Sequence, residues 1–177
     1  GYRSLYNNTT AGANTAVGNS AMFYNTTGFD NVAVGQASMY LNGTGSRNTA
    51  VGNASLGVNT SGGNNVAVGN GALKVSTTAS QNTAVGRQAL EDTTTGQYNA
   101  AFGYRAGDTI TTGNYCTSIG NLANTVTSTG EGNTMVGYDI NPSSATVGNE
   151  LVIGTNGMVG KGSQTAFING GNGPTFN

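Results

Sequence analysis

The sequence predicts an all-β protein, a parallel β-solenoid built from coils of 17 residues. The first observation is a glycine that recurs every 17 residues from Gly18 to Gly154, with no insertion. The second is a short strand-like run before each glycine, such as the Asn-Thr-Ala-Val-Gly segment that ends at Gly18. The third is a polar turn later in the coil, which usually holds a second glycine, such as Gly28. A fixed short period of this kind is typical of solenoids, in which each coil stacks on the next.

The repeated glycine is interpreted as the corner of each coil, where unusual backbone angles and close approach are needed. The column consists of Gly18, Gly35, Gly52, Gly69, Gly86, Gly103, Gly120, Gly137 and Gly154. The run before each glycine alternates between larger and smaller side chains, which indicates a strand. We predict that the larger residues, Thr15 and Val17 in the first full coil, point into the core. The alanine between them, Ala16, should belong to a flat outer face.

A second short strand is expected after each corner, at pairs such as Ala21-Met22 and Ala72-Leu73. Met22, with Phe23, is then predicted to join Thr15 and Val17 in the core. Few such side chains are available in each coil, and ordering 17 residues costs free energy of about the same size as their burial returns. We therefore expect the alanine face to pack against other copies of the chain, as a homotrimer about the long axis.

An asparagine four residues before the corner glycine predicts a ladder of side-chain amides. Its members are Asn14, Asn31, Asn48, Asn65, Asn82, Asn99 and Asn133. Stacked amides can hydrogen-bond from coil to coil, as in cross-β assemblies. Cys116 and Glu150 replace asparagine at this position. Cys116 is interpreted as a small buried residue that fills a gap in the ladder, with a disulfide between chains as the alternative.

The repeat divides the chain into two parts. Residues 1–154 form the predicted repeat domain, and residues 155–177 are predicted to be a cap or tip segment, because they are glycine-rich and depart from the pattern. Pro142 interrupts the last coils, and a proline cannot donate a hydrogen bond within a sheet.

Composition argues against several functions. Only 7% of the residues are charged, and the six Lys and Arg residues are scattered singly, so we expect neither nucleic acid nor membrane insertion. The chain has no histidine, which excludes a Ser-His-Asp triad and a histidine metal site. Glu91 and Asp108 share one position in adjacent coils, but we expect them to form a solvated edge. We predict that the protein is not an enzyme and needs no cofactor.

The repeat resembles those of two families of surface fibres. The segment from Asn64 to Gly69 resembles the head repeat of trimeric autotransporter adhesins, whose motif is Asn-Ser-Val-Ala-Ile-Gly. The longer unit from Asn82 to Tyr98 looks more like the β-roll repeats of phage tail fibres, which precede an endosialidase-type intramolecular chaperone. The passage from Val136 to Gly154 is similar to the join between those repeats and the chaperone. The resemblance implies a left-handed parallel β-roll and a homotrimer.

Function is expected at coil positions where the residue type changes from one coil to the next. Five residues after the corner stand Tyr6, Phe23 and Tyr40, a row of aromatics that is typical of platforms for sugars or proteins, although packing against a neighbouring turn is the alternative. The resemblance implies a virion tail-fibre segment, a rod that presents a tip to a host-surface glycan or outer-membrane component. The alternatives are a bacterial cell-surface adhesin head, an ice-binding solenoid and a polysaccharide-degrading tailspike. Irregular threonine spacing counts against ice binding, and the lack of paired acids counts against the tailspike.

Overall fold

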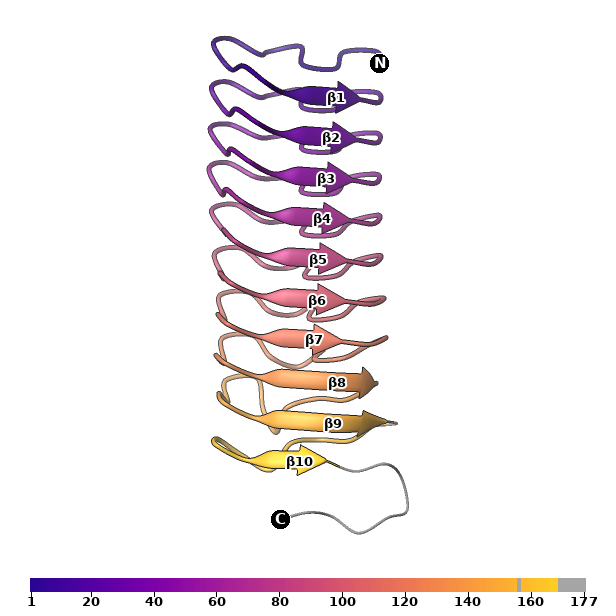
Figure 1. Ribbon diagram of the computed structural model, residues 1–177, viewed down its shortest axis with the longest axis vertical. Helices are drawn as coiled ribbons and strands as arrows, with labels where there is room; N and C mark the ends of the chain where they lie inside the picture. Colours follow the sequence, from indigo (N-terminus) through magenta and orange to yellow (C-terminus); the bar gives the residue numbers. More distant parts are fainter. Residues whose placement is uncertain (156, 169–177) are drawn as a thin grey trace.

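The protein is a β-solenoid in the computed structural model, which describes residues 1–155 and 157–168. Ten short strands form one parallel sheet in sequence order, stacked along the long axis (Figure 1). The strands are β1 (Thr15–Val17), β2 (Val32–Val34), β3 (Thr49–Val51), β4 (Val66–Val68), β5 (Thr83–Val85), β6 (Ala100–Phe102), β7 (Thr117–Ile119), β8 (Thr134–Tyr138), β9 (Leu151–Thr155) and β10 (Ala166–Ile168). The predicted parallel β-solenoid with 17-residue coils is confirmed.

The pairing register keeps the 17-residue period through most of the sheet. Ala50 of β3 pairs with Ala67 of β4, for example, and the same offset holds from β1 to β9. The last pairing is different, because Leu151 of β9 lies opposite Ala166 of β10, only 15 residues further on. The sheet thus extends one strand past Gly154. Part of the predicted cap, residues 156 and 169–177, lies outside the described residues.

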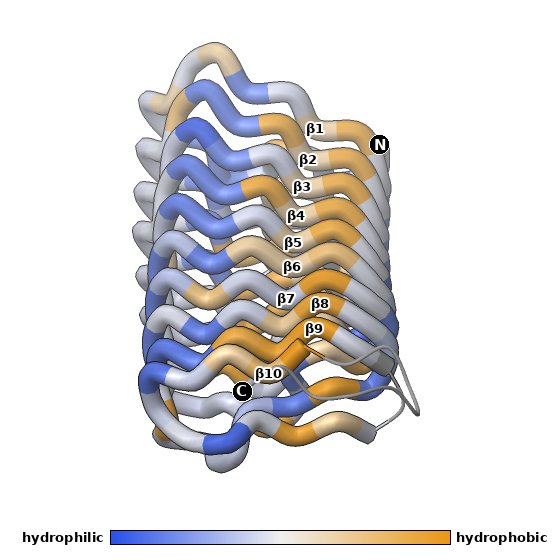
Figure 2. The backbone as a smooth tube through the Cα atoms, turned by 60° about the horizontal axis from the view of Figure 1, so that its bottom comes forward, coloured by the Kyte–Doolittle hydropathy of each residue, from blue (hydrophilic) through white to orange (hydrophobic). Residues whose placement is uncertain are grey.

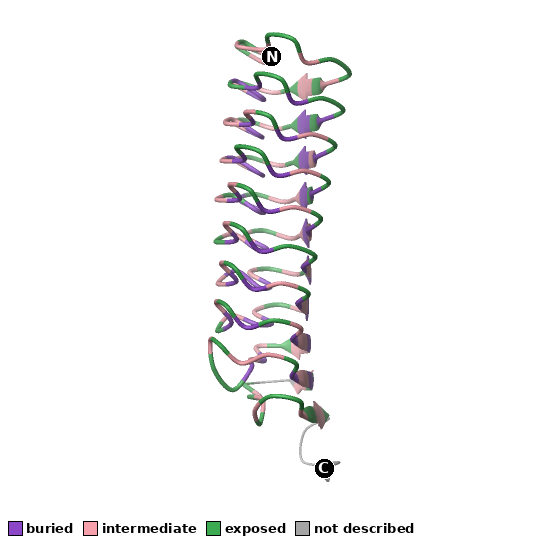
Figure 3. Cartoon of the chain, turned by 90° about the vertical axis from the view of Figure 1, so that its left-hand side faces the viewer, coloured by how far each residue is buried: buried purple, intermediate pink, exposed green. Residues whose placement is uncertain are grey.

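The predicted orientation of the strands is wrong. The second residues of β2 to β9 are fully buried, including Ala33, Ala50, Ala67, Ala84 and Ala101. The first and third residues of the strands point outward, and Val17 is 55% exposed. Figure 3 shows this alternation along the sheet. The physical reason is space: each coil from β1 to β5 already encloses a fully buried leucine or methionine, such as Leu56 or Leu73, and the small side chain of alanine fits opposite it.

The predicted second strand is also wrong, because a turn occupies those residues. Met22 and Leu56, four residues after their corner glycines, adopt left-handed backbone angles with φ of 49° and 47°. The residue two positions earlier is also left-handed, as at Ser20 and Ala54. This double reversal turns the chain sharply and aims the large side chain into the coil. Met22 and Leu56 are fully buried as a result.

The corner glycines are required by both backbone angle and space. From Gly18 to Gly137 their φ values lie between 128° at Gly120 and 146° at Gly137, a region that side chains disfavour. A Cβ atom added to Gly69 would lie 2.4 Å from the carbonyl oxygen of Gly86 in the next coil. The coils therefore stack closely only because this column has no side chains. The predicted role of the corner glycines is confirmed.

One coil shows how the core volume is kept constant. Gly107 occupies the position that leucine or methionine holds in the preceding coils, and Ile110 is fully buried three residues later. A Cβ atom on Gly107 would lie 3.0 Å from Cδ1 of Ile110 and 2.9 Å from Cδ2 of Leu90. Ile110 thus fills the space that the missing side chain would leave. This exchange within one coil preserves close packing.

Candidate functional site

The outer face of the sheet is a regular surface that runs along the solenoid. We define it as the first and third residues of each strand, β1 to β10. None of these residues is charged, and the third is always aliphatic or aromatic. Val34, Val51, Phe102, Ile119 and Ile153 are among its exposed members. Figure 2 shows the hydrophobic stripe that the strands make along the stack. Parallel sheets normally have both faces covered, so this face is unusual in a single chain.

The asparagines four residues before the corner form a hydrogen-bonded ladder inside the solenoid. The Oδ1 atom of each accepts a bond from the backbone N–H of the next coil, as from Asn65 to Asn48 at 2.9 Å. The Nδ2 atom donates within its own coil, as from Asn65 to the carbonyl of Ala79 at 2.9 Å. Each of Asn31, Asn48, Asn65, Asn82, Asn99 and Asn133 makes both kinds of bond, and Asn14 makes the same two at the top of the ladder. These amides are occupied by backbone groups, which makes the column structural.

A second asparagine ladder was missed in the sequence. Asn25, Asn42 and Asn59 lie seven residues after their corners and are fully buried. Their Nδ2 atoms donate to the Oδ1 of the preceding coil, at 2.8 Å from Asn25 to Asn8 and 2.6 Å from Asn59 to Asn42. The signal was the same residue at a 17-residue spacing. It ends at Ser76, where the column changes composition.

The predicted aromatic row is brought together. Phe23 stacks between Tyr6 and Tyr40, with ring centroids 5.2 Å and 5.3 Å away. Tyr24 packs its edge against Phe23 at 4.6 Å. Tyr6 is 65% exposed, whereas Phe23 is only 9% exposed. The guanidinium of Arg3 lies 5.8 Å from the Tyr6 ring centroid, within cation–π range. Phe23 therefore serves mainly as packing, and the tyrosines form the accessible surface.

A second aromatic stack is present that the sequence analysis did not identify. Tyr98 and Tyr115 lie in adjacent coils, with ring centroids 5.0 Å apart and planes inclined by 6°. Both rings are exposed, at 45% and 61%. Their 17-residue spacing was a readable signal, but it spans only two coils.

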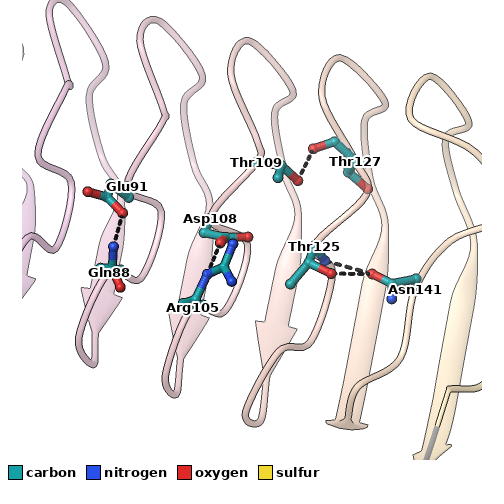
Figure 4. A network of polar contacts seen from close by, with 8 residues as sticks. All are labelled: Gln88, Glu91, Arg105, Asp108, Thr109, Thr125, Thr127 and Asn141. Atoms are coloured by element: carbon teal, nitrogen blue, oxygen red, sulfur yellow. Dashed lines mark hydrogen bonds and ion pairs between the residues drawn. The ribbon is translucent and has the colours of Figure 1, made fainter.

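The acidic pair is not the solvated edge that was predicted. Asp108 is only 4% exposed, and its Oδ2 accepts a bond from Nε of Arg105 at 2.5 Å (Figure 4). Glu91, one coil away, contacts Gln88 at 2.5 Å and Lys74 at 3.3 Å. Each carboxylate thus contacts its own partners, and the two carboxylates do not face a common binding space. This geometry does not provide two acids facing a common substrate, as glycoside hydrolysis requires.

Burial controls the titration of Asp108. Loss of solvation raises the pKa of its carboxyl above the ordinary value of 3.8, and the hydrogen bond from Arg105 opposes this shift. The other oxygen, Oδ1, is buried and has no hydrogen-bond partner. The same pairing raises the pKa of Arg105. Asp108 is therefore a costly buried group held by one cation.

The two substitutions in the asparagine ladder have different consequences. Cys116 is buried, and its backbone N–H still donates to Oδ1 of Asn99 at 2.9 Å. Its sulfur lies inside its own chain, where it is not available for a disulfide to another copy. Burial also raises the pKa of its thiol. The structure thus agrees with the gap-filling interpretation.

Glu150 fastens the C-terminal coils together. It is 1% exposed, and its Oε2 accepts a bond from the backbone N–H of Ser143 at 2.7 Å. Its Oε1 accepts a bond from the backbone N–H of Gly162. A Cβ atom on Gly160 would lie 2.5 Å from both carboxylate oxygens, so a side chain at that position would displace the Glu150 carboxylate. The Glu150 side chain therefore connects the loop at Ser143 with the loop at Gly162, two segments outside the regular repeat.

A shallow depression lies beside β10. Its volume is about 330 Å³, and it is lined by Lys161, Gln164, Thr165, Ala166 and Phe167. The Lys161 ammonium lies 5.1 Å from the centroid of the Phe167 ring. Within residues 1–155 and 157–168 no group of three or more acidic, cysteine or histidine side chains could hold a metal ion. That part of the chain also contains no helix long and apolar enough to cross a membrane.

Comparison with known proteins assigns no family. No protein-family model matches the chain, and searches among curated proteins and solved structures return no similar protein. The resemblance of the repeat to tail fibres and adhesin heads therefore stays an expectation.

Proposed function

We propose that this chain is a segment of a homotrimeric tail fibre, a rigid rod that presents binding surfaces to a host-surface glycan or outer-membrane component. The observation that carries the proposal is the uncharged, apolar outer face of the sheet. By strand spacing, the face is roughly 45 Å long and about 10 Å wide. Its third column is aliphatic or aromatic in every strand, and exposed apolar surface of this kind is often functional.

The outer face replaces the alanine column as the proposed contact between chains. Burying it would cover both faces of a parallel sheet, the usual arrangement for such sheets. The uncharged columns, at the first and third strand positions, need no ion pairs for their burial. The number of three chains is supported by the resemblance of the repeat to tail-fibre and adhesin rolls, both of which are trimeric.

The hydrogen bonding between coils supports a role of the rod as a rigid spacer. Hydrogen bonds from coil to coil run through the sheet, the two asparagine ladders and a threonine column in which Thr77 Oγ1 donates to the carbonyl of Thr94 at 3.0 Å. Each coil is bonded along its whole perimeter to its neighbours, so local opening would break several bonds at once. Three parallel copies would also present each surface three times, which increases avidity for a weak ligand.

The tyrosines of the aromatic row are the proposed receptor contact. We expect Tyr6→Ser together with Tyr24→Ser to weaken attachment to host cells by at least tenfold, without changing the oligomeric mass. The matched control is Tyr138→Ser, which removes an exposed tyrosine outside the row. Unchanged attachment of the double variant in a cell-binding assay would exclude this row as the contact.

An adhesin head is the alternative source, and it shares the rod, the trimer and the exposed tyrosines. The two are separated by the sequence that adjoins this segment in the full gene. A chaperone domain after the rod supports a tail fibre, whereas a neck, coiled coil and membrane anchor support an adhesin. Sequencing the flanks therefore tests the source without affecting the proposed assembly.

A further inference from the structure

The Tyr98–Tyr115 stack occupies an unfavourable backbone position. Both residues lie five positions before their corner glycines, and φ is 58° at Tyr98 and 59° at Tyr115. The left-handed region is disfavoured for side chains, and bulky ones are genuine outliers there. Other coils use Ala13, Asp30, Arg47, Asn64, Gln81, Gly132 and Asn149 at this position. Asparagine, aspartate and glycine are the residues that tolerate it best.

Packing does not compensate for the two tyrosines. Both rings remain exposed, so little apolar surface is removed from water. One stacked pair returns a gain that is no larger than the strain of two left-handed residues. Left-handed residues recur along the solenoid from Arg3 to Gln164, so the backbone angle alone does not mark a site. The two exposed, stacked rings form an aromatic platform, and this exposure points to a ligand.

An open position lies directly beneath the stack. The next coil has Gly132 where a third ring would stand, so this position has no side chain to cover Tyr115, and the Tyr115 ring is 61% exposed. Strands β6, β7 and β8 mark the three successive coils in Figure 1. The coil after that contributes Asn149, whose Oδ1 lies 2.6 Å from the point where a Cβ of Gly132 would be. The position thus has an aromatic wall above and an amide below.

Polar side chains border this position in a fixed arrangement. Nδ2 of Asn114 donates to Oε1 of Glu131 at 2.7 Å, and Oδ1 of Asn114 accepts a bond from the backbone N–H of Gln97 at 2.8 Å. These bonds fix the Asn114 amide and the Glu131 carboxylate, which directly precede Tyr115 and Gly132 in the chain. A ring face flanked by a few fixed polar groups is typical of small-ligand sites. The exposed Glu131 carboxylate also disfavours acidic ligands.

We propose that the position beneath Tyr115 binds a neutral hexopyranose ring, as the third member of the stack. A sugar ring would place its C–H face on Tyr115 and its hydroxyls toward Asn149, Glu131 and Asn114. This site lies outside the aromatic row that begins at Tyr6, and it does not require assembly into a trimer. An acidic sugar is disfavoured by the Glu131 carboxylate, and a purely apolar ring would leave the surrounding polar groups unused.

The test uses saturation-transfer NMR with methyl β-D-galactopyranoside and methyl β-D-glucopyranoside as probes. Sorbitol, which carries hydroxyls but no ring, is the control probe. We expect transfer to at least one glycoside and none to sorbitol. Tyr98→Asn with Tyr115→Asn should reduce the transfer at least tenfold, and should leave the thermal midpoint unchanged or higher, because asparagine is native at this position in Asn64 and Asn149.

A second variant distinguishes the contribution of the tyrosine rings from that of the open position at Gly132. Gly132→Asn keeps both tyrosines but fills the open position, and the only close contact is the end of the flexible Asn149 side chain. We expect it to abolish transfer while the protein stays folded. No transfer from either glycoside to the native protein would overturn the proposal. A lower thermal midpoint or an altered oligomeric mass of the double asparagine variant would also overturn it, because the rings would then be structural or an interchain contact. Neither result depends on the Tyr6 row.

Discussion

The Oδ1 atom of Asn65 accepts a hydrogen bond from the backbone N–H of Asn82 at 3.0 Å, one coil further along the rod. The same side chain donates to the carbonyl of Ala79 at 2.9 Å. Asn65 is fully buried, so water cannot replace either bond. One amide therefore satisfies two backbone groups and connects neighbouring coils.

Asn65→Ala should consequently be strongly destabilising. It leaves a buried N–H and a buried carbonyl unsatisfied, which costs about 1–3 kcal/mol for each group. We expect the free energy of unfolding in denaturant to fall by about 2–6 kcal/mol. The control is Asn70→Ala, at an exposed position. Equal stabilities of the two variants would show that the ladder contributes little.

Gly69→Ala tests the corner. Its φ of 135° is forbidden to alanine, and the added Cβ would approach the Gly86 carbonyl oxygen to 2.4 Å. We expect a loss of at least about 3 kcal/mol in the free energy of unfolding. Gly12→Ala is the comparison, since a Cβ there has no heavy atom within 4 Å and φ is not in the left-handed region. Similar behaviour of both variants would contradict the close stacking.

Ala54→Gly should stabilise the protein. Ala54 has a φ of 53°, and the equivalent residue in the next coil is already Gly71. Glycine removes a strain of about 1–2 kcal/mol, but it loses about 0.4–1 kcal/mol through the unfolded chain. A net gain of about 0.5–1 kcal/mol is expected in chemical denaturation. A loss of stability would mean that the left-handed turn is not strained.

Asp108 should make stability depend on pH. Burial raises the pKa of its carboxyl above 3.8, so the folded state binds this proton more tightly than the unfolded chain. The contribution of this group is therefore present below pH 3.8 and is lost as pH rises through the folded-state pKa. We expect the difference in free energy of unfolding between the native protein and Asp108→Asn to change in favour of the variant across that interval.

The control for Asp108 is Asp30→Asn, which removes an exposed carboxylate several coils away. The pH profile of Asp108→Asn should differ from that of this control over the same pH range. Parallel pH profiles for the native protein and Asp108→Asn would show that burial does not affect the carboxyl.

The solenoid and its period could be predicted because they depend on repetition. Which residues of each strand point into the core could not be predicted, since this depends on the side-chain volume available inside the coil. Larger side chains were assigned to the core, but buried Leu56 and Leu73 leave room only for Ala50 and Ala67. The mixture of threonine and valine at Thr49 and Val66 was an overlooked sign of the exposed face.

The turn after the corner glycine could not be predicted from the sequence either. Leucine and methionine seldom adopt left-handed angles, so nothing in Leu56 or Met22 indicates a φ near 50°. The tightness of the coil imposes it. The Tyr98–Tyr115 stack was missed for a different reason, because two residues are too few to be recognised as a column. The Tyr6, Phe23 and Tyr40 row was found because three aromatics recur in phase.

A further prediction concerns the outer face of the sheet as the contact between chains. Val66→Lys introduces a charge at an exposed, uncharged position of β4, and burying that charge between chains would be unfavourable. We expect this variant to dissociate into folded monomers. Ser61→Lys is the control, because it adds the same charge in an exposed turn. Assembly of both variants to the same mass would place the interchain contact elsewhere.

The most direct test of the proposed fibre segment is the mass of the unmodified chain in solution. Light scattering at micromolar concentration should give three times the chain mass of 17.7 kDa. A stable species of 17.7 kDa at that concentration would contradict the proposal, because the outer face of the sheet would then be exposed to water in the working protein.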